Sequence, residues 1–304
     1  MTEFSVLVDT STWQPGFERR LRAAYGAVGY PEAAAEFSLG RLRDGIAEWT
    51  VAEIRSAGTR VGFVAVTMEA DTPTGRIGDL WVDAAHAGQG HERAARTWAE
   101  GWCARQGATR VAVRLVEPDV LFADYPVRGQ LRMRVIAAAA TPFDGVTARP
   151  MTPAEYPGWL AAENAAFAAD IVRSGATTPD EARKKADRAY TELIPEGLDT
   201  EDHSILVLEH AGARIGTGWL KHRHMPGVTF GFSLEVDEEH RGKGYGRAAM
   251  AVGERATVEA GDSALMFNVF GGNEVAMSLY TSAGYPVVEE TRSIELPTRT
   301  GSLP

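Results

Sequence analysis

The chain contains an internal repeat, which limits the folds open to it more than any other feature of its sequence. Eight positions of the first half recur in the second half at a constant offset of 154 residues. The matched pairs are Leu80/Leu234, Val82/Val236, Asp83/Asp237, His86/His240, Gly88/Gly242, Gly90/Gly244, Arg93/Arg247 and Gly107/Gly261. Solenoid repeats are only about 20 to 50 residues long. The sequence therefore predicts two copies of one domain-sized fold.

A length of 304 residues is sufficient for two domains. The segment 141–145, Thr-Pro-Phe-Asp-Gly, is rich in turn-forming residues and follows the last strand-like run of the first copy. We place the boundary there, which gives predicted domains of residues 1–144 and 145–304.

Helix-like and strand-like patterns are mixed in both halves. Residues 1–46 look mostly helical, and further helices are expected after each glycine-rich loop and at 153–174, 179–193 and 273–283. Strands are expected at 49–55, 60–68, 76–82, 111–116, 131–135, 204–210, 214–221, 229–236, 265–269 and 286–295. Because strands and helices do not alternate strictly, the predicted class is α/β of the α+β kind. Each copy is expected to form a mixed, largely antiparallel twisted sheet flanked by helices.

Composition narrows the classes of partner and location. The net charge of −10 argues against a nucleic-acid partner, whose phosphates would be repelled, and is compatible with cationic substrates. The apolar runs are too short to span a bilayer, and the N-terminus lacks the pattern of a signal peptide, so a cytoplasmic location is expected. Cys103 is the single cysteine, which excludes an intrachain disulfide and favours a buried free thiol.

The segment from Leu234 to Gly246 has the pattern of a phosphate-binding loop. A strand-like run ends at Val236, and the loop then supplies three glycines spaced by single residues, with Arg241 and Lys243 among them. A helix-like run follows. This order points backbone N–H groups and the positive end of a helix at one place, which suits a phosphate or pyrophosphate.

At Arg241-Gly242-Lys243-Gly244-Tyr245-Gly246 the second copy resembles the GNAT superfamily of acyl-CoA-dependent N-acyltransferases. Arg241, Gly244 and Gly246 fill the positions of the family's loop signature, and the similarity continues downstream. Asn268 lies on the next strand, Asn273 opens the next helix, and Tyr280 stands four residues before Gly284. The resemblance covers residues 147–297.

This resemblance implies acetyl-CoA as the cofactor, bound between the strand that ends at Val236 and the next strand. The pantetheine arm is expected along the backbone of Leu234, Glu235 and Val236, where an N–H group polarises the thioester carbonyl. The remaining cofactor-binding residues that the resemblance implies are Arg241, Gly242, Lys243, Gly244, Tyr245, Gly246 and Asn273.

The resemblance also implies roles in proton transfer. Tyr280 matches the tyrosine that protonates the departing thiolate, with a packed helix tyrosine as the alternative interpretation. Glu235 is expected to be the general base, although strand alternation also allows it to face solvent. His222 and His224 are alternatives that act through a water. They lack a visible third ligand, so no metal site is expected.

The first copy departs from the pattern, with Ala87 in place of Arg241, Glu92 in place of Gly246 and Asp119 in place of Asn273. A carboxylate at position 92 competes with a pyrophosphate for the same N–H groups. We therefore interpret the first copy as a degenerate domain that has a structural role and shapes the substrate site, and that either binds no cofactor or holds one without turnover. Catalysis is expected in the second copy alone.

The leading functional hypothesis is direct transfer of an acetyl group from acetyl-CoA to a primary amine of a small molecule. Glu163, Asp170 and Glu192 on the expected helices either attract this cation or form an ordinary solvated face. The alternatives are a non-catalytic acyl-CoA-binding or regulatory protein and, less favoured, aminoacyl transfer from charged tRNA. The sequence is compatible with a monomer or a homodimer.

Overall fold

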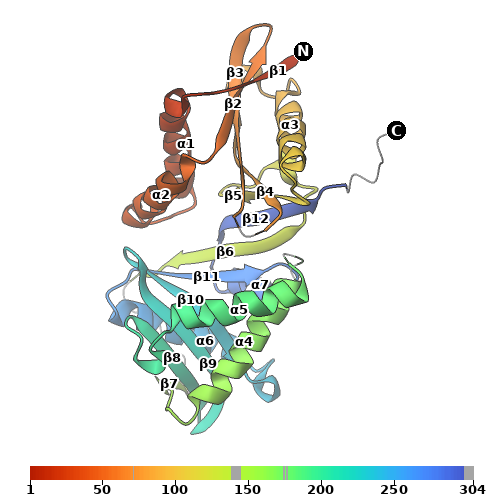
Figure 1. The fold of residues 1–304 in the computed structure, drawn as a ribbon. Helices are drawn as coiled ribbons and strands as arrows, with labels where there is room; N and C mark the ends of the chain where they lie inside the picture. Colours follow the sequence, from red (N-terminus) through yellow and green to blue (C-terminus); the bar gives the residue numbers. More distant parts are fainter. Residues whose placement is uncertain (71, 138–144, 174, 176, 298–304) are drawn as a thin grey trace. The chain divides into compact units, whose positions relative to one another are not determined.

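The described residues of the computed structural model are 1–70, 72–137, 145–173, 175 and 177–297. The chain divides into two compact units (Figure 1). Unit 1 consists of Met1–Ala27, Ser38–Val127 and Glu289–Pro304, and unit 2 consists of Val28–Phe37 and Arg128–Val288. Except for Gly145, the expected boundary segment 141–145 lies outside the described residues.

Unit 1 contributes six strands, which follow the order β1-β2-β3-β4-β5-β12. Its strands are β1 (Thr2–Val6), β2 (Thr50–Ser56), β3 (Thr59–Met68), β4 (Thr74–Val82), β5 (Arg110–Leu115) and β12 (Val287–Glu295), of which β12 belongs to unit 1 from Glu289 onward. The helices that pack on this sheet are α1 (Gln14–Ala27), the C-terminal part of α2 (Glu32–Ile46) and α3 (His91–Arg105). Only β4 and β5 pair in parallel among the strand pairs recorded for the described part of this unit.

Unit 2 contributes six strands, which follow the order β6-β11-β10-β9-β8-β7. Its strands are β6 (Val127–Val135), β7 (Val146–Pro150), β8 (His203–His210), β9 (Ala213–Met225), β10 (Val228–Val236) and β11 (Ala264–Phe270). Its helices are α4 (Tyr156–Arg173), α5 (Pro179–Leu193), α6 (Tyr245–Glu259) and α7 (Glu274–Ser282). The expected class, a mixed and largely antiparallel sheet flanked by helices in each of two copies, is confirmed.

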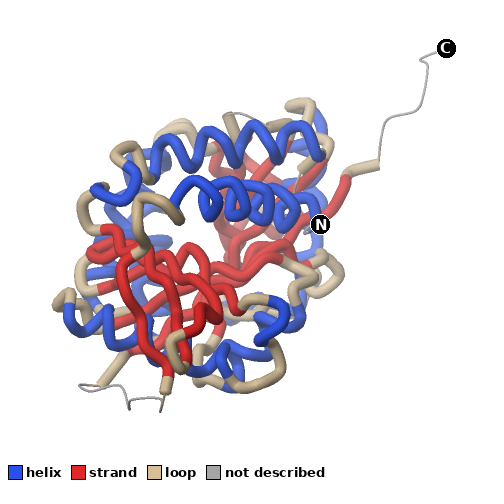
Figure 2. Tube along the Cα trace, turned by 90° about the horizontal axis from the view of Figure 1, so that it is seen from below, coloured by secondary structure: helices blue, strands red, loops and turns tan. Residues whose placement is uncertain are grey.

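Strand alternation sends successive side chains to opposite helix layers. In unit 2, Val207 packs with α4 and α5, whereas its neighbour Leu208 packs with α6. In unit 1, Phe63 packs with α1, and Val64 packs with α3. Helices, blue in Figure 2, accordingly flank the red strands. Within the described ranges, every helix is too short or too polar to span a bilayer.

The expected elements are largely confirmed, including α5, which begins and ends at the expected residues. Thr178 caps it with a complete capping box to Glu181, and Pro179 occupies its first turn. The first strand of each copy, β1 and β7, was not anticipated; residues 1–46 are therefore not simply helical. Both strands have five residues and lie at an edge of their sheet, and β1 has no fully buried side chain to reveal it by alternation.

The last strand of each copy lies in the sheet of the other unit. Strand β6 follows the first copy in sequence, yet Arg128–Val135 belong to unit 2, where β6 pairs with β11. Strand β12 closes the second copy, yet it pairs with β5 in unit 1 from Glu290 to Glu295. The compact units therefore do not follow the linear division expected near residue 144, because each contains the last strand of the other copy.

Candidate functional site

The glycine-rich loop of unit 2 connects β10 to α6. Asp237 N–H donates to the carbonyl of Ile215 at 2.9 Å, and a short 3₁₀ turn then covers Glu238–His240. Gly242 and Gly244 adopt φ angles of +76° and +85°, and a Cβ added to either glycine would meet no other atom within 4 Å. Left-handed backbone of this kind favours glycine. The loop therefore opens the first, unpaired N–H groups of α6 to an anion.

The corresponding loop of unit 1 has the same backbone. Gly88 and Gly90 adopt φ angles of +74° and +90°, and a 3₁₀ turn covers Ala84–His86. Here, however, the Glu92 carboxylate accepts a hydrogen bond from the Gly88 N–H at 3.0 Å. The protein's own carboxylate thus occupies an N–H group of this loop, and the loop of unit 2 has Gly246 in place of that carboxylate.

Strands β10 and β11 separate beside the loop. Their parallel pairing covers Val228–Gly231 against Ala264–Phe267, and both strands continue beyond it. The register of β10 against β9 shifts between Gly231 and Ser233, which marks a bulge at this point. The edge of β10 from Ser233 to Val236 is therefore turned away from β11, as expected for a strand that pairs with an extended ligand.

Close backbone contact between β9 and β10 fixes this edge. A Cβ on Gly216 would lie 2.1 Å from the carbonyl oxygen of Glu235, whereas a Cβ on Gly218 would meet only Leu234 Cδ1 at 3.6 Å. We expect Gly216→Ala to lower the free energy of unfolding by about 1–3 kcal/mol and to raise the KM for the cofactor, because the end of β10 must move. Gly218→Ala is the matched control in the same strand. Equal urea denaturation midpoints for the two variants would contradict this account.

In this structure the two cationic side chains of the loop form hydrogen bonds with other groups of the protein. Arg241 Nε donates to the Val236 carbonyl at 3.0 Å, and its NH2 lies 3.3 Å from Glu235 Oε1. Lys243 Nζ donates to the Glu239 carbonyl at 3.0 Å. All of these groups are on the exposed side of the loop, where exchange of one partner for a phosphate costs little.

The other expected cofactor residues border the loop. Tyr245 begins α6 with its ring 5.1 Å from that of His210, and a Cβ on Gly246 would lie 3.2 Å from Leu279 of α7. Asn273 caps α7 by accepting a hydrogen bond from Ala276 N–H at 3.1 Å. Its side-chain oxygen is therefore engaged within the helix, and its amide NH2 group is the part suited to contact a ligand.

Tyr280 lies on α7 and is 8% exposed. Its ring stacks on Phe267 of β11 at 5.0 Å between centroids, beside the strand opening. Burial raises the pKa of Tyr280 above its ordinary value, and the Arg132 guanidinium of β6 acts in the opposite direction. The phenol therefore stays protonated at neutral pH, which is the state that a proton donor requires.

The expected base and its alternatives occupy different surroundings. Glu235 has a half-exposed side chain and pairs with Arg241. His222 is buried between Ser204 Oγ at 2.8 Å and Thr229 Oγ1 at 3.1 Å, and burial lowers its pKa. Both ring nitrogens of His222 are thus used within the protein, whereas the ring of His224 packs against Phe230.

One carboxylate of this region is buried, which the sequence did not indicate. Glu163 of α4 is 7% exposed, and its Oε1 accepts a hydrogen bond from Ser233 Oγ of β10 at 2.9 Å. By contrast, Asp170 pairs with Arg173, and Glu192 is exposed. The helical spacing of Glu163 from Trp159 and Phe167, both four residues away, was the available signal, because it places the carboxylate on the apolar face of α4.

Burial raises the pKa of Glu163 to about 7, and the charge of Glu235 acts in the same direction. The hydrogen bond from Ser233 opposes this shift, and the polar groups of Trp159 and Tyr190 add to that opposition. The carboxyl group of Glu163 therefore binds its proton more tightly in the folded chain than in the unfolded chain. Protonation of Glu163 contributes to the free energy of unfolding below pH 4.5, and this contribution is lost as the pH rises through about 7.

We therefore expect Glu163→Gln to stabilise the ligand-free protein at pH 8 relative to the wild type by up to about 3 kcal/mol. At pH 4.5 the two proteins should have nearly equal stability, because the wild-type carboxyl group is then protonated and neutral. Urea denaturation at both pH values measures the difference, with Glu192→Gln as the exposed control. A stability difference that does not change with pH would refute the raised pKa.

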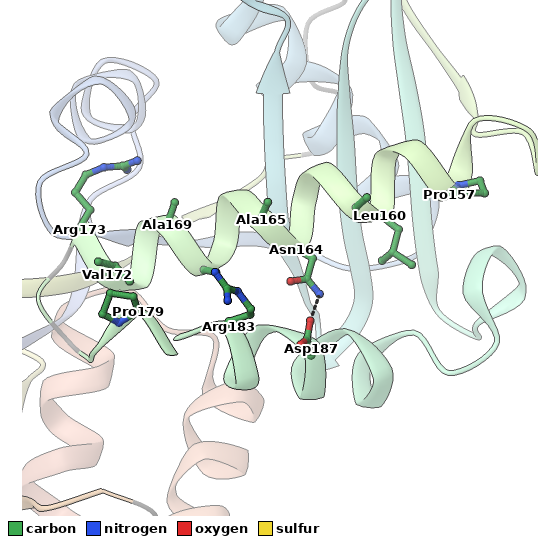
Figure 3. A pocket seen from close by; sticks show the side chains of 12 residues that line it. Pro157, Leu160, Asn164, Ala165, Ala169, Val172, Arg173, Pro179, Arg183 and Asp187 are labelled. Atoms are coloured by element: carbon green, nitrogen blue, oxygen red, sulfur yellow. Dashed lines mark hydrogen bonds between the residues drawn. The ribbon is translucent and has the colours of Figure 1, made fainter. Parts of the chain in front are cut away.

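A cavity of about 880 Å³ lies along α4 and α5, away from the glycine-rich loop. Figure 3 shows Asn164 and Asp187 joined across it by a hydrogen bond of 3.0 Å. Its lining is mainly alanine side chains of α4, with Pro179, Arg183 and Asp187 from α5. It contains none of the residues that border the strand opening, so we assign the candidate site to the loop and the opening instead.

Comparison with known proteins identifies this arrangement. The model of the Acetyltransferase (GNAT) family matches residues 14–122 and 170–285. A mycothiol acetyltransferase of Streptomyces avermitilis is 28% identical over 263 residues, which are 82% of this chain and 80% of that protein. The uncharacterized N-acetyltransferase YycN of Bacillus subtilis is 28% identical over 151 residues, 48% of this chain and 96% of that protein.

The fold has a counterpart among solved structures. A GCN5-related N-acetyltransferase from Sphaerobacter thermophilus aligns with 96% of this chain and covers 95% of its own, with a TM-score of 0.59 and 18% identity. The family model matches both copies and well over half of the residues. The chain belongs to the GNAT family of acetyltransferases, and it is an acyltransferase built from two GNAT repeats.

Proposed function

We propose that the protein transfers an acetyl group from acetyl-CoA to a primary amine of a small molecule, by direct attack, in unit 2. The observation that carries this proposal is the contrast between the two loops. The loop at Gly242 and Gly244 leaves its N–H groups open beside a cation, whereas Glu92 fills the twin loop.

The residues present fit acetyl-CoA. Left-handed glycines and the first turn of α6 suit its pyrophosphate, with Arg241 and Lys243 within reach of it. The opened edge from Leu234 to Val236 suits an extended pantetheine arm. When bound, the thioester supplies the activated acetyl group.

The proposed roles in the reaction follow from position and protonation state. A backbone N–H group of the β10 edge hydrogen-bonds the developing oxyanion, and Tyr280 gives its proton to the departing thiolate. The ammonium of the acceptor must first lose a proton. The sequence points to Glu235 for that step, and the structure adds a second carboxylate to be tested against it.

Two measurements test the proposal. Isothermal titration should give one acetyl-CoA bound per chain, because only one loop is open. Thiol release in the presence of a panel of primary amines should then exceed the rate without amine. Tight binding with no thiol release from any amine would support the non-catalytic alternative, and two bound cofactors per chain would contradict the assignment of unit 1.

The similarity to mycothiol acetyltransferases suggests one specific acceptor for the panel of amines. The mycothiol acetyltransferase of Streptomyces avermitilis matches 82% of this chain at 28% identity, and that of Amycolatopsis mediterranei matches 88% at 27% identity. The unacetylated precursor of mycothiol is therefore a specific member of the panel. Preference for it over simple amines by more than about tenfold in kcat/KM would narrow the proposed function to that acceptor.

A further inference from the structure

Glu163 is a buried carboxylate that the proposed reaction leaves without a role. Its Oε1 is bonded to Ser233 Oγ, which lies at the bulge of β10 where the strand opens. Within the described ranges, no lysine, arginine or histidine side chain lies within ion-pair distance of Glu163. A buried carboxylate without a cation is costly, and such groups are normally paired.

At the equivalent strand position of unit 1, a carboxylate is paired with a cation of the protein. Asp79 of β4 corresponds to Ser233, because both lie opposite equivalent residues of the preceding strand, Ala65 and Trp219. Asp79 is bound by Arg20 NH2 at 2.6 Å and by Trp13 Nε1 at 2.7 Å. Unit 1 therefore holds a carboxylate and its own guanidinium between helix and strand, where unit 2 holds a carboxylate alone.

The surroundings of Glu163 suit an organic cation. Trp159 and Tyr190 lie beside it, and their rings belong to an aromatic cluster that includes Trp219 and Phe232. The indole Nε1 of Trp159 is buried and forms no hydrogen bond of normal geometry within the described structure. Aromatic faces stabilise ammonium groups, and the indole N–H of Trp159 acts on the Glu163 carboxylate, whose pKa it lowers.

The site also lies at the correct end of the cofactor. A pyrophosphate held at the loop that follows Val236 would let an extended arm run back along β10 toward Ser233, with the thioester at that end. Glu163 adjoins Ser233. An amine held there would meet the thioester carbonyl from the α4 side of the strand.

We propose that Glu163 binds the ammonium group of the acceptor and takes one of its protons before attack, in a subsite walled by Trp159, Tyr190 and Phe232. The chemical class of acceptor is a primary amine carried on an apolar or aromatic group. This inference rests on the proposed function, because it assigns the acceptor side of the same site.

The proton and bond changes balance. The ammonium R–NH3⁺ gives one proton to the Glu163 carboxylate, and the neutral amine forms an N–C bond to the acetyl carbon as the C–S bond breaks. The sulfur receives a proton from Tyr280, which regains one as the amide nitrogen loses its second proton. Glu163 returns its proton to water, so one proton is released for each acetyl group transferred.

The titratable groups that face Glu163 are Glu235 on β10 and Tyr190 on α5. Glu235 is half exposed, whereas Glu163 is buried. Two neighbouring carboxylates in such different environments commonly have different roles: one stays charged and attracts a cation, and the other exchanges a proton. Glu235, at the opening, attracts the cation, and Glu163 receives the proton.

Amine binding without acetyl-CoA tests the subsite independently of catalysis. We would titrate phenethylamine, hexylamine and spermidine into the full chain at pH 8 and follow tryptophan fluorescence, because Trp159 and Trp219 border the site. Phenethylamine or hexylamine should bind more tightly than spermidine. Glu163→Gln should weaken this binding at least tenfold, whereas Glu192→Gln should leave it unchanged. Absence of binding by all three amines, or equal binding by both variants, would overturn the subsite.

Kinetics with acetyl-CoA test the proton transfer. Glu163→Gln should lower kcat/KM by at least tenfold and abolish the acidic limb of its pH profile, and Glu163→Asp should restore part of the rate with that limb. A full rate and an unchanged profile in Glu163→Gln, with loss in Glu235→Gln instead, would return the role of base to Glu235. If no amine releases thiol while Glu163-dependent binding persists, the subsite stands and the proposed reaction fails.

Discussion

Replacing Arg241 with glutamate is expected to raise the KM for acetyl-CoA by about 10- to 100-fold with a much smaller effect on kcat. A charge-assisted hydrogen bond is worth about 1.5–3 kcal/mol, which corresponds to that range of affinity. The side chain is mainly exposed and contacts only the end of β10 and Glu235, so the variant should fold normally. Initial rates at varied acetyl-CoA concentration measure the effect.

The repeat supplies a control for this substitution. Arg93 lies at the corresponding helix start of unit 1, and Arg93→Glu changes the net charge of the protein by the same amount. If unit 1 binds no cofactor, this variant should retain the wild-type KM. Equal changes in both variants would indicate a general effect of charge and would remove Arg241 from the site.

Replacing Tyr280 with phenylalanine is expected to lower kcat by roughly 10²-fold, the usual contribution of a positioned proton donor. The ring should keep its stacking on Phe267, so the fold and the KM for acetyl-CoA should change little. Since the pKa of Tyr280 is raised, wild-type kcat should show no decline from this group between pH 7 and 9. Single-turnover rates of thiol release separate this chemical step from product release.

Tyr125 is the matched control in unit 1. Its hydroxyl donates to Glu100 Oε1 at 2.7 Å, so Tyr125→Phe should cost about 1 kcal/mol of stability and leave kcat unchanged. A Tyr280→Phe variant as active as the wild type would restrict Tyr280 to packing against Phe267 and Tyr285.

The sequence anticipated features that depend on local chemistry. The glycine-rich loop before α6, the helix at 179–193 and the carboxylate at Glu92 each depend on residues close to their own position. Their effects could therefore be inferred without knowing the fold. The buried thiol of Cys103 was likewise anticipated and is confirmed.

Features that depend on distant partners were not anticipated. Alternation along β6 and β12 predicts strands but does not specify which strand each one pairs with. Glu163 was expected either to attract a cation or to belong to a solvated face, and its burial was not anticipated because it involves Ser233, seventy residues further along the chain. In both cases the deciding contact is between segments that the sequence alone does not bring together.

The exchange of the last strands also constrains the order in which the chain can fold. Arg110 of β5 contacts Glu295 of β12 across 185 residues of sequence, so the first sheet closes a very long loop. Contacts of this range slow folding, because the entropy of loop closure opposes them before they stabilise anything. During synthesis, unit 1 cannot complete its set of strands until β12 has left the ribosome. Its β5 edge stays open for strand pairing throughout that interval.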